Sequence, residues 1–149
     1  MKIVKVLKLK PTQMALGLEE VHAKVKDLLK LSKSQLQKEL RKNPITVVQA
    51  PNKEYYIVDG HHRVFAYWLL GIKSTSIKVE HRFGKTVSFV NFWKQMLHNH
   101  WAHPFDLSGE GPHDPLYLAK DIRGLGNDPY RSLAWLVRIN GGYKKTDQT

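Results

Sequence analysis

The sequence contains no cysteine, and this absence excludes disulfide bonds and thiolate chemistry. It also lacks a long apolar segment, because no run approaches the roughly 18 consecutive apolar residues of a membrane-spanning helix. The first residues, Met1 to Val6, alternate lysine with aliphatic residues and lack the apolar run of a signal peptide. We therefore expect a cytoplasmic protein that does not enter a membrane.

Acidic residues are few: 13 Asp and Glu stand against 24 Lys and Arg, which gives a formal net charge of +11. This excess favours polyanionic partners such as nucleic acid, nucleotides or phosphorylated substrates. The same charge also suits solubility or an acidic protein partner, so it does not identify a ligand by itself. With 149 residues, 42% of them hydrophobic, the chain has the size and composition of one packed domain.

The periodicity of the apolar residues predicts an α/β (α+β) fold, with a small mixed sheet of about four strands and helices around it. The expected strands are 3–9, 45–50, 55–58 and a short one at 77–79, and the second and third form a hairpin. The expected helices are 18–31, 34–41 with Ser34 as cap, 61–70 closed by Gly71, 88–99, a short one at 116–122 and 128–140. We expect one domain over 1–149, with an α/β core over 1–85 and a mostly helical extension over 86–149.

The strongest functional signal is the stretch from Asp59 to Arg63, where an expected strand meets an expected helix. A helix start has unpaired N–H groups and a partial positive charge, which suit a phosphate or another anion. Gly60 allows a tight turn, and the guanidinium of Arg63 can donate two hydrogen bonds to phosphate oxygens. Asp59 could cap the helix or bind a metal, while His61 and His62 could contact phosphate or transfer protons. A capped helix with solvated histidines is the simpler alternative.

Other residues are open to both a functional and a structural interpretation. Glu20 and Lys24 are four residues apart, so they form either a helix-surface ion pair or part of a catalytic group. Gln13, beside an expected strand end, could contact a base or a polar group of a substrate. Several aromatic residues at helical spacing belong to the core more readily than to a base-stacking surface. These are Phe89, Phe92, Trp93 and Trp135.

Two further groups lie in the second half of the chain. His98, His100 and His103 suggest zinc, but their spacing matches no familiar metalloenzyme motif, and solvated histidines or phosphate contacts are simpler. Asp128 is placed to cap the last helix, while Arg131 either faces outward or reaches the anion held at the earlier turn.

The segment Gly60-His61-His62-Arg63-Val64-Phe65-Ala66 resembles the G-x-x-R-x-x-A phosphate-binding motif of the ParB/sulfiredoxin superfamily. There the motif follows a hairpin whose first strand begins with Pro-Ile, as at Pro44-Ile45. The Asp-Gly-His-His-Arg form is similar to that of free-serine kinases. Both ends of the chain resemble a narrower branch, that of ParB-like nucleases. The matching residues are Pro11-Thr12-Gln13 with Gly17, Glu20, Val21 and Lys24, and the segment Asp128 to Ala134.

The resemblance covers nearly the whole chain and implies a ParB/sulfiredoxin-like core that holds nucleotide phosphates at this turn. Superfamily members bind and hydrolyse CTP, transfer phosphate from ADP or ATP, or repair a sulfinic acid, and nuclease activity has been attributed to some. Sulfiredoxin chemistry is excluded because it uses a catalytic cysteine. We do not expect centromere-type DNA recognition, since the partition proteins use further domains for it. In the kinase branch a glutamate near the N-terminus acts as base; by position this is Glu20, or else Glu19.

We therefore expect a ParB-like phosphate-processing protein of the nuclease type, which binds a nucleotide (ATP, ADP or CTP) or nucleic-acid phosphate. The expected catalytic residues are Glu20, Asp59 and His62, with Asp59 also a candidate ligand for Mg²⁺. The expected phosphate- or nucleotide-binding residues are Gly60, His61, His62, Arg63, Gln13, Lys24 and Arg131. The alternatives are a small-molecule kinase that uses ATP or ADP, similar to free-serine kinases, and a non-catalytic nucleotide- or DNA-binding regulator. A homodimer is compatible with each.

Overall fold

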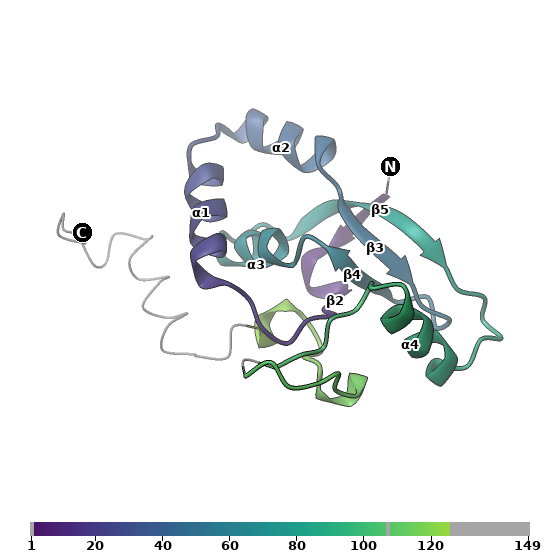
Figure 1. Cartoon of the computed structure of the whole chain (residues 1–149). Coiled ribbons are helices and arrows are strands. Elements are labelled where there is room, and N and C mark those ends of the chain that lie inside the picture. Colours follow the sequence, from purple (N-terminus) through teal and green to yellow (C-terminus); the bar gives the residue numbers. More distant parts are fainter. Residues whose placement is uncertain (1, 107, 126–149) are drawn as a thin grey trace.

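A five-stranded mixed sheet forms the centre of the protein, in the order β1-β5-β3-β4-β2 (Figure 1). The computed structural model describes residues 2–106 and 108–125. The strands are β1 (Lys2–Lys5), β2 (Leu9–Lys10), β3 (Ile45–Gln49), β4 (Tyr55–Asp59) and β5 (Ser74–Arg82). β3 and β4 form the expected antiparallel hairpin, β5 lies parallel to β3, and the two short N-terminal strands pair with the outer edges. The mixed α/β prediction is confirmed, with one strand more than expected.

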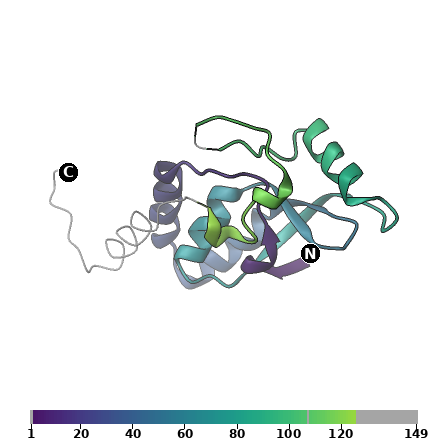
Figure 2. The same cartoon turned by 90° about the horizontal axis from the view of Figure 1, so that it is seen from below.

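Helices cover both faces of this sheet. They are α1 (Leu18–Leu29), α2 (Lys33–Lys42), α3 (His61–Leu69) and α4 (Phe89–His98). Side chains alternate between the faces along each strand. Val47 and Ile57 accordingly pack in one apolar cluster with α1, α2 and α3, whereas Val48 and Tyr56 pack in a second cluster with α4. In both views α4 lies at the end of the described region opposite α1 (Figures 1 and 2).

The predicted strand over 3–9 is wrong as a single element. A 3-10 turn, η1 (Val6–Lys8), separates β1 from β2 and carries the chain from one edge of the sheet to the other. Val6 and Leu9 are buried whereas Ile3 and Leu7 are exposed, so burial does not follow the alternation of one straight strand. The main-chain N–H of Val6 donates to the carbonyl of Lys73 at 2.8 Å and anchors this turn.

Several other boundaries differ from the prediction. Ser32 rather than Ser34 caps α2, because its hydroxyl accepts from the N–H of Gln35 in a capping box. The last strand is longer than expected, since β5 pairs with β1 in its first half and with β3 in its second. Phe89 was expected in the core but is 42% exposed.

The segment after α4 is irregular, as expected, but the predicted short helix over 116–122 is wrong. Two 3-10 turns replace it, η2 (Pro115–Tyr117) and η3 (Ile122–Gly124), with extended backbone at Leu118 and Asp121 between them. The predicted helix over 128–140 lies outside the described residues. Within residues 2–106 and 108–125, no helix is long and apolar enough to cross a membrane.

Candidate phosphate site at the start of α3

The turn between β4 and α3 depends on Gly60. Its φ of +107° and ψ of 18° lie in the left-handed region, where the absence of a side chain removes the steric cost. A Cβ at this position would lie 3.0 Å from Cδ1 of Ile45 and 3.1 Å from Nη2 of Arg63. One residue thereby separates the end of β4 from the start of α3, and the first N–H groups of α3 have no acceptor within the helix. As predicted, strand and helix meet at this glycine.

His61 points into the protein. Its side chain is buried, and its Nε2 accepts a hydrogen bond of 2.9 Å from the main-chain N–H of Thr12. The hydroxyl of Thr12 donates to the carbonyl of Ile57 at 2.6 Å, so the loop before α1 is tied to both β4 and α3. Burial, together with the nearby His62, lowers the pKa of His61 to about 3. The ring is therefore neutral at pH 7 and cannot offer a charge to a phosphate as expected; only its main-chain N–H remains available.

His62 lies between the starts of two helices. Its Nε2 accepts from the main-chain N–H of Gly17 at 3.2 Å, and its Nδ1 lies 3.5 Å from Oε2 of Glu20. Because Nε2 is an acceptor, the proton of a neutral ring sits on Nδ1 and faces the carboxylate. Within residues 2–106 and 108–125 no ion pair joins Glu20 to Lys24. The structure thus places Glu20 beside His62 instead of in the helix-surface pair.

Arg63 lies half-buried on the first turn of α3. Its Nη1 donates to the carbonyl of Asn43 at 2.8 Å, and its Nη2 lies 3.5 Å from the carbonyl of Pro44. These contacts tie α3 to the end of α2 and the start of β3. No carboxylate in the described part of the chain forms an ion pair with Arg63. A guanidinium has five N–H donors, so donors remain for an anion, as does its charge.

Three other predicted site residues lie in the described part of the chain, on β4, on α1 and in the loop before α1. Asp59 is exposed at the end of β4, and Lys24 is exposed on α1. Gln13 forms an isolated parallel bridge with His103, whose N–H donates to the carbonyl of Thr12 at 2.9 Å. Gln13 therefore lies in the same loop that holds His61. Arg131 belongs to the residues that the structure does not describe.

Residues 2–149 match the model of the family described as "Putative ParB-like nuclease". The chain belongs to this family. The crystal structure of protein Atu1540 from Agrobacterium tumefaciens is similar, with a TM-score of 0.72 and 30% sequence identity. That similarity covers 98% of this chain and 71% of Atu1540. No curated protein matches the chain. The predicted resemblance to the ParB-like nuclease branch is therefore confirmed.

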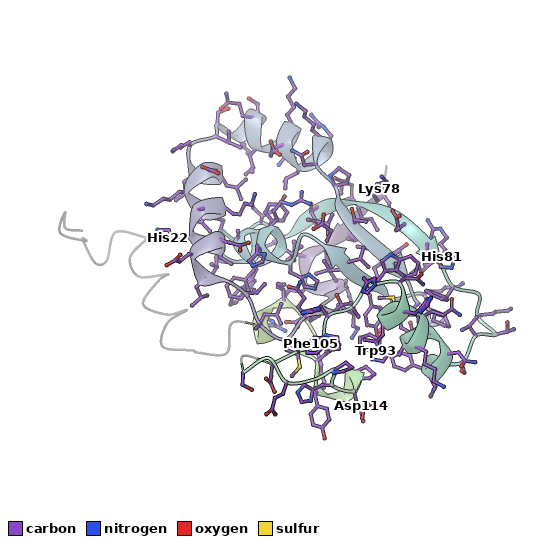
Figure 3. The ribbon with its side chains drawn as sticks, in the orientation of Figure 1. His22, Lys78, His81, Trp93, Phe105 and Asp114 are labelled. Carbon is purple, nitrogen blue, oxygen red and sulfur yellow. The ribbon has the colours of Figure 1, made fainter. Side chains whose placement is uncertain are left out.

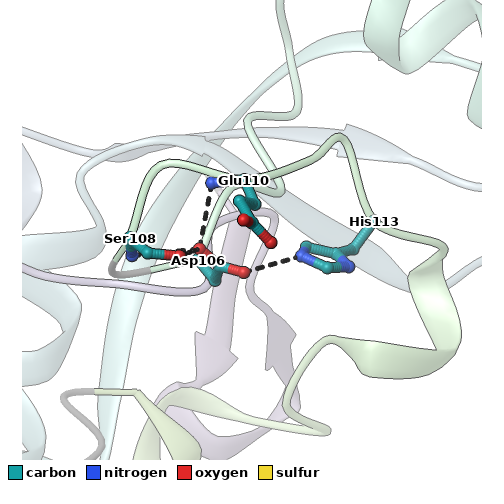
Figure 4. A network of polar contacts seen from close by, with 4 residues as sticks. All are labelled: Asp106, Ser108, Glu110 and His113. Carbon is teal, nitrogen blue, oxygen red and sulfur yellow. Dashed lines mark hydrogen bonds and ion pairs between the residues drawn. The ribbon is translucent and has the colours of Figure 1, made fainter.

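The long loop of this ParB-like protein is organised by Asp106, which the sequence interpretation missed. Oδ1 of Asp106 accepts from the N–H and hydroxyl of Ser108 and from the N–H of Glu110, and Oδ2 lies 3.0 Å from Nε2 of His113 (Figure 4). The hydrogen bonds from Ser108, followed by that from His113, hold the pKa of Asp106 well below its usual range. An Asp followed two residues later by Ser, then by Gly, is a turn signal that could have identified this loop.

Metal ligands do not gather in the described part of the protein. No group of three or more His, Asp or Glu side chains there could hold a metal ion. His98, His100 and His103 are exposed, and they do not form the zinc site that was weighed against solvated histidines and phosphate contacts. The candidate phosphate turn, residues 59–63, lines neither of two large hollows of about 590 and 720 Å³.

Replacing Gly60 by alanine should destabilise the protein more than the same change at Gly71. Both glycines have positive φ, which costs a residue with a side chain roughly 1–2 kcal/mol. Only Gly60 has close neighbours, since nothing lies within 4 Å of a Cβ at Gly71. We expect Gly60→Ala to lower the free energy of unfolding by about 3 kcal/mol and Gly71→Ala by about 1 kcal/mol, measured in urea. If both variants lost the same free energy of unfolding, the close contacts at Gly60 would not contribute as we expect.

The buried His61 should make stability depend on pH. Its pKa is about 3 in the folded protein against 6.5 for an ordinary histidine, so between these values the unfolded state binds the extra proton. The free energy of unfolding should therefore fall as the pH drops through this window, by at most about 1.4 kcal/mol per pH unit. His61→Gln keeps an acceptor for Thr12 but gains no proton, so its decline from pH 6.5 to 4 should be shallower. If the free energy of unfolding, measured in urea, fell equally with pH in the two proteins, this role of His61 would be refuted.

Proposed function

We propose that this ParB-like protein binds a nucleotide or nucleic-acid phosphate at Gly60 to Arg63 and acts on it as a phosphate-processing enzyme of the nuclease type. The observation that carries the proposal is the half-buried Arg63 on the first turn of α3, which has no acidic partner in the described residues. The unpaired N–H groups and the dipole of the helix add to this positive potential. A net charge of +11 further favours a polyanion.

The residues around the turn divide into binding and proton-transfer roles. Arg63 and the main-chain N–H groups of residues 61–63 would hold the phosphate oxygens. His62 would move the proton through Nε2 once a water or substrate hydroxyl replaces the N–H of Gly17, with the carboxylate of Glu20 supporting the charged ring. Gln13 and Lys24 would extend the binding surface.

Asp59 would supply one oxygen ligand if Mg²⁺ takes part. Mg²⁺ is commonly held by one or two carboxylates together with phosphate oxygens and water, so a single exposed aspartate at the end of β4 fits this mode. The absence of a three-residue cluster in the described part of the chain fits it too. Asp59 and the phosphate oxygens would hold the ion, whose positive charge would offset that of the phosphate.

One observation favours a second candidate, a kinase that transfers phosphate from ATP or ADP to a small hydroxyl compound. The carboxylate of Glu20 lies 3.5 Å from Nδ1 of His62, at the same turn, where a base for an acceptor hydroxyl is needed. Phosphotransfer to serine would identify this activity. A regulator that binds DNA without turnover is the third candidate, and steep salt dependence of DNA binding without products would identify it.

Removing the Arg63 side chain should abolish most phosphate binding. We expect ATP, ADP or CTP, with or without Mg²⁺, to raise the apparent melting temperature of the native protein, because a ligand specific for the folded state stabilises it. In Arg63→Ala the Kd should rise at least tenfold, which corresponds to about 1.4 kcal/mol. Arg41→Ala, on α2, is the charge-matched control. Unchanged nucleotide binding by Arg63→Ala would overturn the phosphate site.

Glu20→Gln and His62→Ala should slow turnover more than they weaken binding. Loss of a proton-transfer group typically costs 10²–10⁴-fold in rate, so we expect a fall of at least about 100-fold in kcat with a small change in Kd. The assays follow cleavage of single- and double-stranded DNA, nucleotide hydrolysis and phosphotransfer to serine. Glu19→Gln, one residue earlier in α1, tests the alternative base and should keep its activity, because Glu20 is the glutamate beside His62. Full activity of both variants would refute their catalytic role.

A further inference from the structure

A second candidate site lies on the sheet face opposite α3. It is a groove of about 720 Å³ between α4 and the segment 114–120, with Tyr56 and Pro11 from the sheet side. Volumes of this size are typical of small-molecule sites. Trp93 on α4 and Asp114 at the start of the segment 114–120 both line this groove, and both are labelled in Figure 3. No residue of the phosphate turn lines it.

The walls of the groove are aromatic and incompletely covered. Trp93 and Tyr56 are 6% and 7% exposed, with ring centroids 6.4 Å apart. At the rim, Phe89, Val90 and Leu116 are 42%, 63% and 91% exposed, so apolar surface remains open to a ligand. Exposed apolar surface gathered at one hollow marks a binding site more often than scattered residues do. Flat aromatic rings suit such walls, because they stack against other rings.

The charged residues of the groove are mostly basic. Lys10, Lys94 and Lys120 line it, against one carboxylate, Asp114. Lys10 lies 3.6 Å from Glu54, whereas Lys94 and Lys120 form no ion pair with any residue that the structure describes. Two ammonium groups therefore remain for a negatively charged ligand.

Two of the residues that line the groove carry polar groups beneath its apolar surface. Nε1 of Trp93 is buried and has no acceptor among the described residues, although buried N–H groups are almost always hydrogen-bonded. Tyr56 adds a phenol that stays neutral, since burial raises its pKa to about 12. The groove thus combines aromatic walls, donors and net positive charge.

We propose that this groove binds a small planar aromatic anion, a ring system that carries a phosphate or a carboxylate. The ring would pack against Trp93 and Phe89, and the anionic group would lie between Lys94 and Lys120. The proposal is independent of the proposed function, because it uses none of the residues of the phosphate turn.

Calorimetric titration of the full chain tests this site with four probes: AMP, 2-naphthoate, adenosine and inorganic phosphate. An Arg63→Ala background weakens binding at the turn at least tenfold, so tight binding that persists in this variant reports the groove. We expect AMP or 2-naphthoate to bind at least tenfold more tightly than adenosine or inorganic phosphate. AMP binding alone would indicate a nucleotide ligand, and naphthoate binding alone an aromatic carboxylate.

Variants then locate the binding. Lys94→Ala with Lys120→Ala should weaken the aromatic anion at least tenfold, Trp93→Phe should weaken it severalfold, and Asp114→Asn should strengthen it. Lys26→Ala, an exposed lysine on α1, should change nothing. The proposal is overturned if neither aromatic anion binds in the Arg63→Ala background, or if the lysine double variant binds as tightly as its parent. If the single variant Arg63→Ala bound neither AMP nor 2-naphthoate while the native protein bound AMP, all binding would lie at the turn.

Discussion

Two main-chain N–H groups, those of Thr12 and Gly17, donate to the ε nitrogens of adjacent histidines at the start of α3. These bonds fix the loop before α1 against the turn after β4, although the two segments are about 45 residues apart in the sequence. They also decide what each ring can do. His61 is buried and neutral, whereas His62 is half-buried and faces Glu20.

The same turn is held from its other side by Arg63. Its guanidinium contacts carbonyl groups at the junction of α2 and β3, so three parts of the chain converge on the first turn of α3. The carbonyl groups hold the guanidinium but carry no net charge, so its positive charge is not neutralised. In an internal ion pair, by contrast, a carboxylate would neutralise it. A rigid, positively charged helix start is the physical basis for a phosphate site.

The sequence predicts those parts of the fold that depend on local signals. Two short apolar runs on either side of the turn at residues 51–54 identify the β3–β4 hairpin, and Gly60 and Gly71 mark both ends of α3. The division of the N-terminal segment into β1 and β2 was not predictable, because it depends on which distant strand each half pairs with. The different environments of His61 and His62 could not be predicted either. They depend on the hydrogen bonds from Thr12 and Gly17, which are distant in the sequence. The aromatic groove arises only when α4 packs against β4.

The most direct test of the proposed phosphate site is an amide ¹H–¹⁵N NMR titration of the full chain with ATP and Mg²⁺. A phosphate at the start of α3 should shift the amide signals of residues 60–64 most strongly, with Gly17 also affected through His62. The signals of residues 89–97 on α4 serve as the internal comparison. Saturable shifts centred on residues 60–64 are the predicted result. Shifts confined to α4, or none at millimolar nucleotide, would contradict a phosphate site at this turn.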